Sequence, residues 1–225
     1  MFLASEKGTT VFLKTGSLLL CHAHSLSYRT PKSLAPDACR KWKSFHFSTR
    51  LKLEGSDHFC RLVVGAASLP VEMGLPLLAH RQTKWYLDAF FFELMSAYDT
   101  LLQEMNVLYA INIDIKSVKW NNISKKLPSQ VNELMRKEQE ASWFKRLLWY
   151  RNTGTHHAYI PADYEREGDG DRTWDYDHHD VQLVYFDTAT NMTEKENIKV
   201  ACPDYLKKML EHIHTVWGKM AEEFD

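Results

Sequence analysis

The amino-acid sequence predicts a mainly α-helical bundle built on two long antiparallel helices, with a small β-hairpin and an N-terminal strand. Three observations support this prediction. Residues 80–111 and 129–157 each carry apolar side chains at spacings of three and four, the period of an amphipathic helix. Short runs at 44–53 and 181–186 instead have the length and composition of strands. The chain of 225 residues suits one domain, or one domain with an appendage.

The N-terminal strand is predicted at residues 44–53, where apolar and polar side chains alternate strictly. The turn-forming residues 54–57 follow this run and are expected to end the strand. Residues 58–79 are apolar but interrupted by two prolines and a glycine, which indicates one short helix and an irregular connection. The inward face of the strand is expected to carry Phe45, Phe47, Thr49, Leu51 and Leu53.

The strongest helical pattern lies at residues 80–111. A helix of this length extends about 45 Å, at 1.5 Å per residue, which suits a bundle or a dimer interface. Residues 112–128 then read as a loop. The polar side of the helix carries Lys84, Asp88, Gln103 and Asn106. Its apolar side carries Leu87, Phe91, Leu94, Tyr98, Leu101, Met105 and Leu108.

A second long helix is predicted from Ser129 to about His157. Ser129 is a suitable N-cap, and Glu133 favours the first turn electrostatically. Pro161 ends the helix at the latest. The helical period leads to Arg151 from an apolar stripe made by Leu134, Ala141, Phe144 and Leu148.

The C-terminal part is predicted to hold a polar loop, a hairpin and a last helix. Residues 161–180 are acidic and contain glycine, which is typical of a surface loop. Residues 181–186 form a strand, and residues 198–200 are expected to be its antiparallel partner. Pro203 is expected to open the final helix. The apolar positions of that helix are Leu206, Met209, Leu210, Ile213, Val216, Trp217 and Met220.

Composition and charge are those of a folded protein without a general affinity for polyanions. Hydrophobic residues make up 44% of the chain and charged residues 25%, a normal balance for a globular protein. The formal net charge of −1 excludes a broadly basic surface but not a local basic site. None of the four cysteines lies in a CxxC pair, and no apolar run reaches about 18 residues. Free thiols, a cytoplasmic location and no membrane association are expected.

The segment 146–157, RLLWYRNTGTHH, brings more reactive side chains together than any other. Arginine can hold a phosphate through its planar fork, and histidine can transfer a proton near neutral pH. Asn152 and His156 are four residues apart and share a helix face. Arg151 lies toward the apolar stripe, where its charge needs a partner or a ligand, and it is expected to face a second subunit. Basic residues at a helix C-terminus also simply complement the helix dipole.

The residues from Arg151 to His156, RNTGTH, resemble one by one the R-N-x-x-x-H form of the motif of the HEPN superfamily. The context is also similar, because the motif follows an apolar stretch late in a long helix that comes after another long helix. The resemblance covers roughly residues 80–220 and is to uncharacterised bacterial HEPN-like proteins with extra segments around the bundle. It implies an N-terminal extension at 1–58, holding the strand, and a HEPN-like helical domain at 59–225.

The resemblance implies a metal-independent endoribonuclease without a cofactor. Two chains would pair so that both motifs line one cleft and cleave RNA to a 2′,3′-cyclic phosphate. Arg151 would clamp the phosphate, Asn152 would orient the site and His156 would transfer protons, with His157 as a rival for that last role. Additional positive charge would come from Lys145, Arg146, Lys125 and Lys126. An antitoxin protein is a further expected partner, since members of the superfamily act in toxin–antitoxin systems and phage defence.

Two other interpretations remain open from the sequence. A HEPN-like chain can be a non-catalytic module that binds a protein partner or a nucleotide. A metal-dependent hydrolase would instead use metal-competent side chains in the loop at 175–180. No known metal signature such as HExxH is present, so a solvated acidic loop and no metal site are expected.

Overall fold

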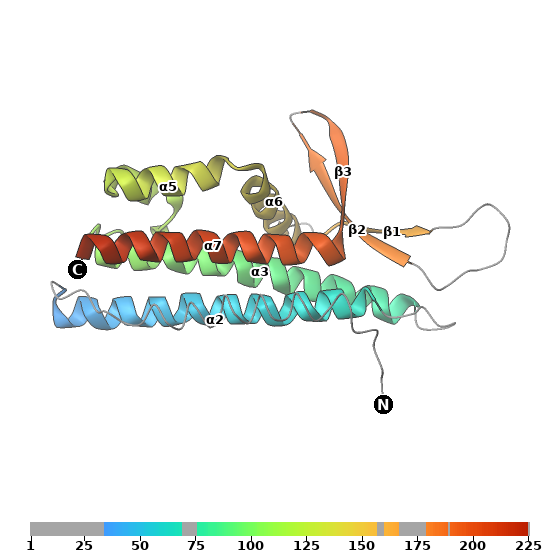
Figure 1. Cartoon of the computed structure of the whole chain (residues 1–225), viewed down its shortest axis with the longest axis horizontal. Helices are drawn as coiled ribbons and strands as arrows, with labels where there is room; N and C mark the ends of the chain where they lie inside the picture. The colour runs from blue at the N-terminus through green and yellow to red at the C-terminus, as the bar shows by residue number, and fades with distance from the viewer. Residues whose placement is uncertain (1–33, 69–75, 157–159, 167–178, 189, 225) are drawn as a thin grey trace.

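Three long helices lie side by side and form the body of the protein (Figure 1). They are α2 (Pro36–Ala66), α3 (Pro76–Leu108) and α7 (Ile198–Phe224). The computed structural model describes residues 34–68, 76–156, 160–166, 179–188 and 190–224. The mainly helical fold predicted from the sequence is confirmed, and the helix expected at 80–111 is α3.

Two shorter helices, α5 (Ser129–Glu140) and α6 (Ser142–His156), lie on the side of α7 away from α2 (Figure 1). Helix α6 packs across α3, where Phe144 contacts Tyr98 and Tyr150 contacts Phe91. The expected loop between α3 and α5 contains three single-turn elements: η1 (Ile115–Ser117), α4 (Trp120–Ile123) and η2 (Ser124–Lys126).

The prediction of a strand at residues 44–53 is wrong, because these residues form the middle of α2. The apolar side chains that alternate in the sequence split between two environments: Thr49 and Leu53 are buried, whereas Phe47 and Leu51 are about half exposed. Several buried positions of α2 are polar, so the helical period is invisible in a hydrophobicity pattern. Helix α2 also runs through the expected domain boundary between residues 58 and 59. The buried positions of α2 are Trp42, His46, Thr49, Leu53, Ser56, Asp57, Cys60 and Val63.

Polar side chains from α2, α3 and α7 meet inside the bundle around Glu104, which is fully buried. The Nδ1 atom of His46 lies 3.0 Å from Glu104 Oε2, and Trp217 Nε1 donates to the same oxygen at 3.1 Å. The Thr49 hydroxyl donates to Glu104 Oε1. The ring of Trp42 stacks on His46 at 5.1 Å and closes the cluster. These contacts fix the register of the three long helices.

The second long helix predicted at 129–157 is in fact two helices. Ala141 separates α5 from α6 with an extended backbone, at φ −65° and ψ 139°. Ser129 does not cap α5 with its side chain, since Pro128 is the N-cap residue. Leu148, expected in the apolar stripe with Phe144, is 37% exposed, because the buried side of α6 turns from Phe144 toward Leu147 and Tyr150. Phe144, Leu147 and Tyr150 form the buried side of α6.

The sheet has three antiparallel strands in the order β1 (Ala162–Arg166), β2 (His179–Asp187) and β3 (Met192–Asn197). The strand predicted at 181–186 is confirmed as part of β2, and β1 lies inside the region expected to be loop. The partner predicted at 198–200 is wrong, because β2 pairs with β3 and α7 already begins at Ile198. Asn197 Oδ1 accepts the Lys199 backbone N–H at 2.9 Å and so caps this helix, which begins five residues before Pro203.

Candidate functional site

The RNTGTH motif occupies the last turns of α6, which ends at His156. Arg151 is half-buried and Asn152 is exposed, so both polar groups reach the surface. His156 is placed as the last helical residue, but its side chain is outside the described set, as is all of His157. The face shared by Asn152 and His156 therefore stays a prediction from their spacing.

Arg151 finds its counter-charge within its own chain. Its Nη1 donates to Asn152 Oδ1 at 3.1 Å, and its Nη2 lies 3.8 Å from Asp99 Oδ2 on α3. The Arg151 side chain is 32% exposed and that of Asp99 is 56% exposed, so the pair is open to solvent on one side. The sequence required a partner or a ligand for this arginine, and Asp99 is the partner that the fold supplies.

Asp99 is a site residue that sequence reasoning missed. Partial desolvation raises the pKa of its carboxyl above the ordinary value, and the charges of Arg151 and Lys119 lower the pKa in part. Asp99 lies 52 positions before Arg151, and in the sequence it is one of many polar residues on the open side of α3. Asp99 lies 11 residues, or three helical turns, after Asp88, so the sequence does place the two carboxylates on one face of the helix.

Gly154 lets the end of α6 approach α3 closely. A Cβ at this position would lie 3.1 Å from Asp88 Oδ1 and 3.1 Å from Ile160 Cγ1. Asp88 Oδ1 also accepts the Ile160 backbone N–H at 3.1 Å, which ties the chain after the motif to α3. Burial raises the pKa of Asp88, while the Ile160 hydrogen bond and Lys84 lower it. A glycine at position 154 therefore allows close packing that a larger side chain would disturb.

Arg146 and Lys145, the expected auxiliary cations, differ in their surroundings. Lys145 is exposed. Arg146 forms ion pairs with Glu194 and Glu196 on β3, and its guanidinium lies 5.2 Å from the ring centre of Tyr185. A helical separation of five residues turns Arg146 about 140° away from Arg151. Arg146 therefore ties the sheet to α6 on the opposite flank of the helix from the motif.

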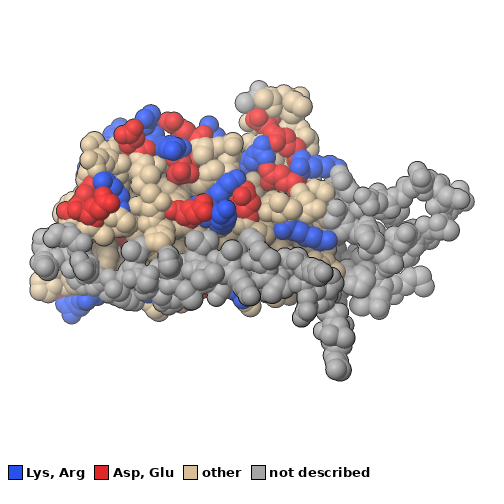
Figure 2. All heavy atoms as spheres, viewed as in Figure 1, with Lys and Arg blue, Asp and Glu red and all other residues tan. Residues whose placement is uncertain are grey.

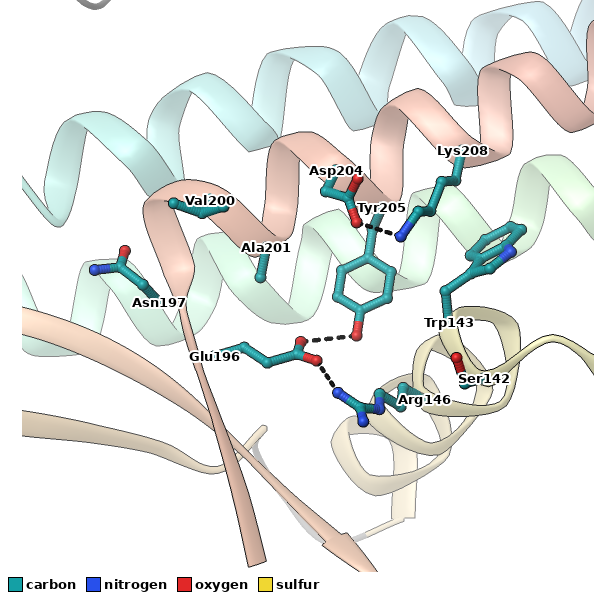
Figure 3. A pocket seen from close by; sticks show the side chains of 10 residues that line it. All are labelled: Ser142, Trp143, Arg146, Glu196, Asn197, Val200, Ala201, Asp204, Tyr205 and Lys208. Carbon is teal, nitrogen blue, oxygen red and sulfur yellow. Dashed lines mark hydrogen bonds and ion pairs between the residues drawn. The ribbon is translucent and has the colours of Figure 1, made fainter.

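A cleft of about 490 Å³ lies beside Arg146, between the start of α6, the end of β3 and the first turns of α7 (Figure 3). Its charged groups satisfy one another: Glu196 accepts from Arg146 and from the Tyr205 hydroxyl, and Lys208 lies 2.5 Å from Asp204 (Figure 3). Trp143 and Tyr205 give the cleft aromatic walls. The motif residues do not line it.

In the part of the chain that the structure describes, no group of three His, Cys, Asp or Glu side chains could hold a metal ion. Residues 175–178 of the acidic loop lie outside the described residues, and His179 and Asp180 are described only as backbone of β2. Among the described helices, none combines the length and the apolar character needed to cross a bilayer. Cys39, Cys60 and Cys202 are free thiols.

The surface charge is finely mixed on the face that carries α5 and α7, where Lys and Arg alternate with Asp and Glu (Figure 2). A polyanion would therefore find no broad basic area on that face. The Arg151 end of α6 offers a different arrangement, with a guanidinium oriented by an amide and balanced by one carboxylate. A phosphate can replace that carboxylate as the partner of the guanidinium.

A long-helix bundle with an Arg-Asn pair at the open end of a packed helix defines a helical domain of the HEPN type. The family model described as HEPN_Cthe2314-like HEPN matches residues 76–216, more than half of the chain. The protein belongs to this HEPN family. The matched stretch begins with α3 and contains Asp99 and the motif. No curated protein matched the chain, and no solved structure matched it.

Proposed function

We propose that this protein is a metal-independent endoribonuclease that acts as a homodimer and cleaves RNA to a 2′,3′-cyclic phosphate. The observation that carries the proposal is the Arg151 guanidinium, hydrogen-bonded to Asn152 at 3.1 Å and held near Asp99 at the exposed end of α6. A cation that is oriented on one side and open on the other suits a phosphodiester. The match of residues 76–216, which include this motif, to a HEPN family model supports the proposal.

The proposed chemistry is internal attack of the ribose 2′-oxygen on the adjacent phosphorus. A neutral His156 takes the 2′-hydroxyl proton, and the departing 5′-oxygen takes up a proton from a second, protonated histidine or from water. Arg151 stabilises the negative charge that grows on the phosphoryl oxygens, and Asn152 holds the guanidinium in position. The phosphorus–5′-oxygen bond breaks as the 2′-oxygen bond forms, so no metal or cofactor is needed. Lys145 adds exposed positive charge on the same helix.

Dimerisation is supported by large apolar side chains exposed beside the motif. On α3, Trp85 is 64% exposed and Phe92 is 51% exposed. Trp85 lies fourteen residues and Phe92 seven residues before Asp99, on the same side of the helix. On α6, the exposed Leu148 lies four residues before Asn152. Apolar groups grouped in this way favour a protein–protein contact, and a second copy would bring a second Arg151 to the site.

The test is incubation of purified protein with RNA in the presence of EDTA. We expect fragments that end in a 2′,3′-cyclic phosphate, no cleavage by Arg151→Ala, and normal cleavage by Arg136→Ala, which removes an arginine that is 61% exposed on α5. His156→Ala and His157→Ala, measured separately, identify the proton-transfer residue. Cleavage that survives Arg151→Ala, or that requires a divalent metal, would falsify the proposal.

The dimer is tested by mixing inactive chains. If the site combines residues from two protomers, a mixture of Arg151→Ala and His156→Ala chains recovers part of the activity that each chain lacks alone. Light scattering should give twice the mass of 26.3 kDa. A monomer that cleaves RNA at full rate would contradict the composite site. The proposal also includes an antitoxin partner and a cytoplasmic location. Co-purification from the cytoplasmic fraction of the native host tests both.

The non-catalytic alternative is favoured by the cleft near Arg146, whose aromatic walls suit the ring of a nucleotide. On this alternative, calorimetry detects nucleotide binding that Trp143→Ala abolishes, while RNA stays intact under all conditions. The two functions give opposite results with the same preparation.

A further inference from the structure

The segment that joins α3 to α5 concentrates positive charge. Residues 115–126, IKSVKWNNISKK, contain four lysines and no acidic residue, in a chain whose formal net charge is −1. We call these residues the basic linker. Its side chains Lys116, Lys119, Lys125 and Lys126 are all exposed. In the described part of the chain none of the four forms a salt bridge, and Lys126 only donates to the Ile111 carbonyl at 3.4 Å.

The basic linker is fixed to the bundle rather than free. Gln103 on α3 donates to the Ile115 carbonyl at 2.8 Å. Asn106, also on α3, binds both the N–H and the C=O of Ile113, at 3.0 and 2.8 Å. Within the linker, Ile123 is fully buried, and Ser124 O accepts from Asn132 on α5. The lysines therefore extend from a backbone held at both ends, which lowers the entropic cost of binding a ligand.

The basic linker begins next to the motif. Gln103, which holds Ile115, lies four residues after Asp99 on the same side of α3. Asp99 in turn lies 3.8 Å from Arg151. Lys119 is close enough to Asp99 to lower the pKa of its carboxyl. The cations are thus arranged in sequence across the surface, from Arg151 on α6 to Lys119 and Lys116 on the linker.

We propose that the basic linker binds the sugar–phosphate backbone of single-stranded RNA on one side of the bond at Arg151, with Lys116 and Lys119 as the principal contacts. The proposal rests on the proposed function for the identity of the polymer. Lysines that contact phosphates position a strand without reading its bases, so binding is independent of sequence. Trp120 is packed against the core and does not stack on bases. Lys116 and Lys119 are positioning residues, because they act on flanking phosphates and not on the reacting atoms.

The experiment measures binding of the full chain to a short single-stranded 2′-O-methyl RNA in EDTA, by fluorescence anisotropy over a range of salt. The 2′-O-methyl group removes the attacking hydroxyl, so binding is measured without cleavage. Each lysine–phosphate contact contributes about 0.7 to the slope of log K against log salt. Lys116→Ala/Lys119→Ala should lower that slope by about 1.4 and weaken binding at low salt by roughly tenfold or more.

The matched control is Lys43→Ala/Lys207→Ala, which also removes two exposed lysines but from α2 and α7. It should leave the slope within a few tenths of the wild-type value. With cleavable RNA, the linker variant should show a higher KM and an unchanged kcat. All four replaced side chains are exposed, so we expect both variants to fold normally. An unchanged melting temperature checks this.

Four results would overturn the inference: a wild-type protein that does not bind the RNA, a control as weakened as the linker variant, an unchanged KM in the linker variant, or polyglutamate of matched charge that competes as well as RNA. The last result would mean an acidic protein partner instead. Lysine-dependent binding without cleavage of ordinary RNA would support the basic linker and refute the ribonuclease. RNA cleavage that does not change when Lys116 and Lys119 are replaced would support the ribonuclease and refute the role of the basic linker.

Discussion

Glu104 provides the sharpest test of how the bundle is held together. Its carboxyl group is fully buried and accepts from side chains of α2 and α7. Glu104→Leu keeps the volume roughly constant but removes the acceptor. The indole N–H of Trp217 can only donate, so it becomes an unsatisfied buried donor, and His46 loses the partner of its Nδ1. Thr49 keeps a second acceptor, the Phe45 carbonyl at 3.1 Å.

The expected cost follows from counting these donors. A buried donor that loses its partner costs about 1–3 kcal/mol, so two of them cost about 2–6 kcal/mol. That is a large share of the roughly 5–15 kcal/mol by which a typical domain is stable. Urea unfolding followed by circular dichroism measures this difference. Glu140→Leu is the control, because the Glu140 side chain is 64% exposed and its loss should cost under about 0.5 kcal/mol.

A double variant separates lost hydrogen bonding from general damage to the core. Trp217→Phe removes the donor that Glu104→Leu leaves unsatisfied. Replacing both partners of a buried hydrogen bond is far less costly than replacing one. Glu104→Leu/Trp217→Phe should therefore unfold at a higher urea concentration than the sum of the single effects predicts. Strict additivity, or a Glu104→Leu protein as stable as wild type, would refute the account of the cluster.

Three further predictions concern stability. Burial lowers the pKa of His212 to about 4, so below about pH 6.5 the unfolded chain binds a proton that the folded protein excludes. The free energy of unfolding is therefore highest above pH 6.5 and falls by up to about 1.4 kcal/mol per pH unit toward pH 4. Urea midpoints at pH 7 and pH 5 should show that loss shrinking in His212→Leu and persisting in His214→Leu. Arg146→Ala breaks two ion pairs to β3 and should cost about 1–3 kcal/mol, whereas a neutral effect would make those pairs incidental. Gly154→Val should lower the melting temperature by crowding Ile160, at a cost of about 1–3 kcal/mol, and an unchanged value would show that the segment moves freely.

The long helices differ in how far the sequence predicts them. Helix α3 is predictable because most of its buried positions are apolar and recur at spacings of three and four. Helix α2 is not, since the positions that face its neighbours include His46 and Thr49, which bond to Glu104 more than 50 residues later in the chain. Polar residues are stable at core positions only when other parts of the fold supply hydrogen-bond partners. The sequence of one segment does not reveal those partners.

The break at Ala141 was also outside the reach of pattern reasoning. No glycine or proline marks it, and the residues on both sides favour a continuous helix. Extrapolating one period through Ala141 placed Leu148 in the core and Arg151 at its edge. Leu148 is exposed instead, because the buried side of α6 includes Phe144, Leu147 and Tyr150 and leaves Leu148 at its margin.

The candidate site was half predictable. The motif residues are neighbours in sequence, so their spacing alone places Arg151 beside Asn152 on a helix end. Asp99 and the basic linker reach the same place through the packing of α3 on α6 and through the hydrogen bonds of Gln103 and Asn106. Tertiary contacts of this kind leave no periodic trace in a single sequence.

Helix α2 precedes the stretch of the chain that the family model matches, yet it buries one side of α3 and supplies two of the groups around Glu104. We therefore expect a fragment cut at residue 59 or 76, which lacks His46 and Thr49, to expose the Glu104 carboxyl group amid apolar surface and to be less stable than the full chain. Relatives limited to the matched stretch must cover that surface in another way, with a different helix, a partner protein or an apolar residue in place of the glutamate.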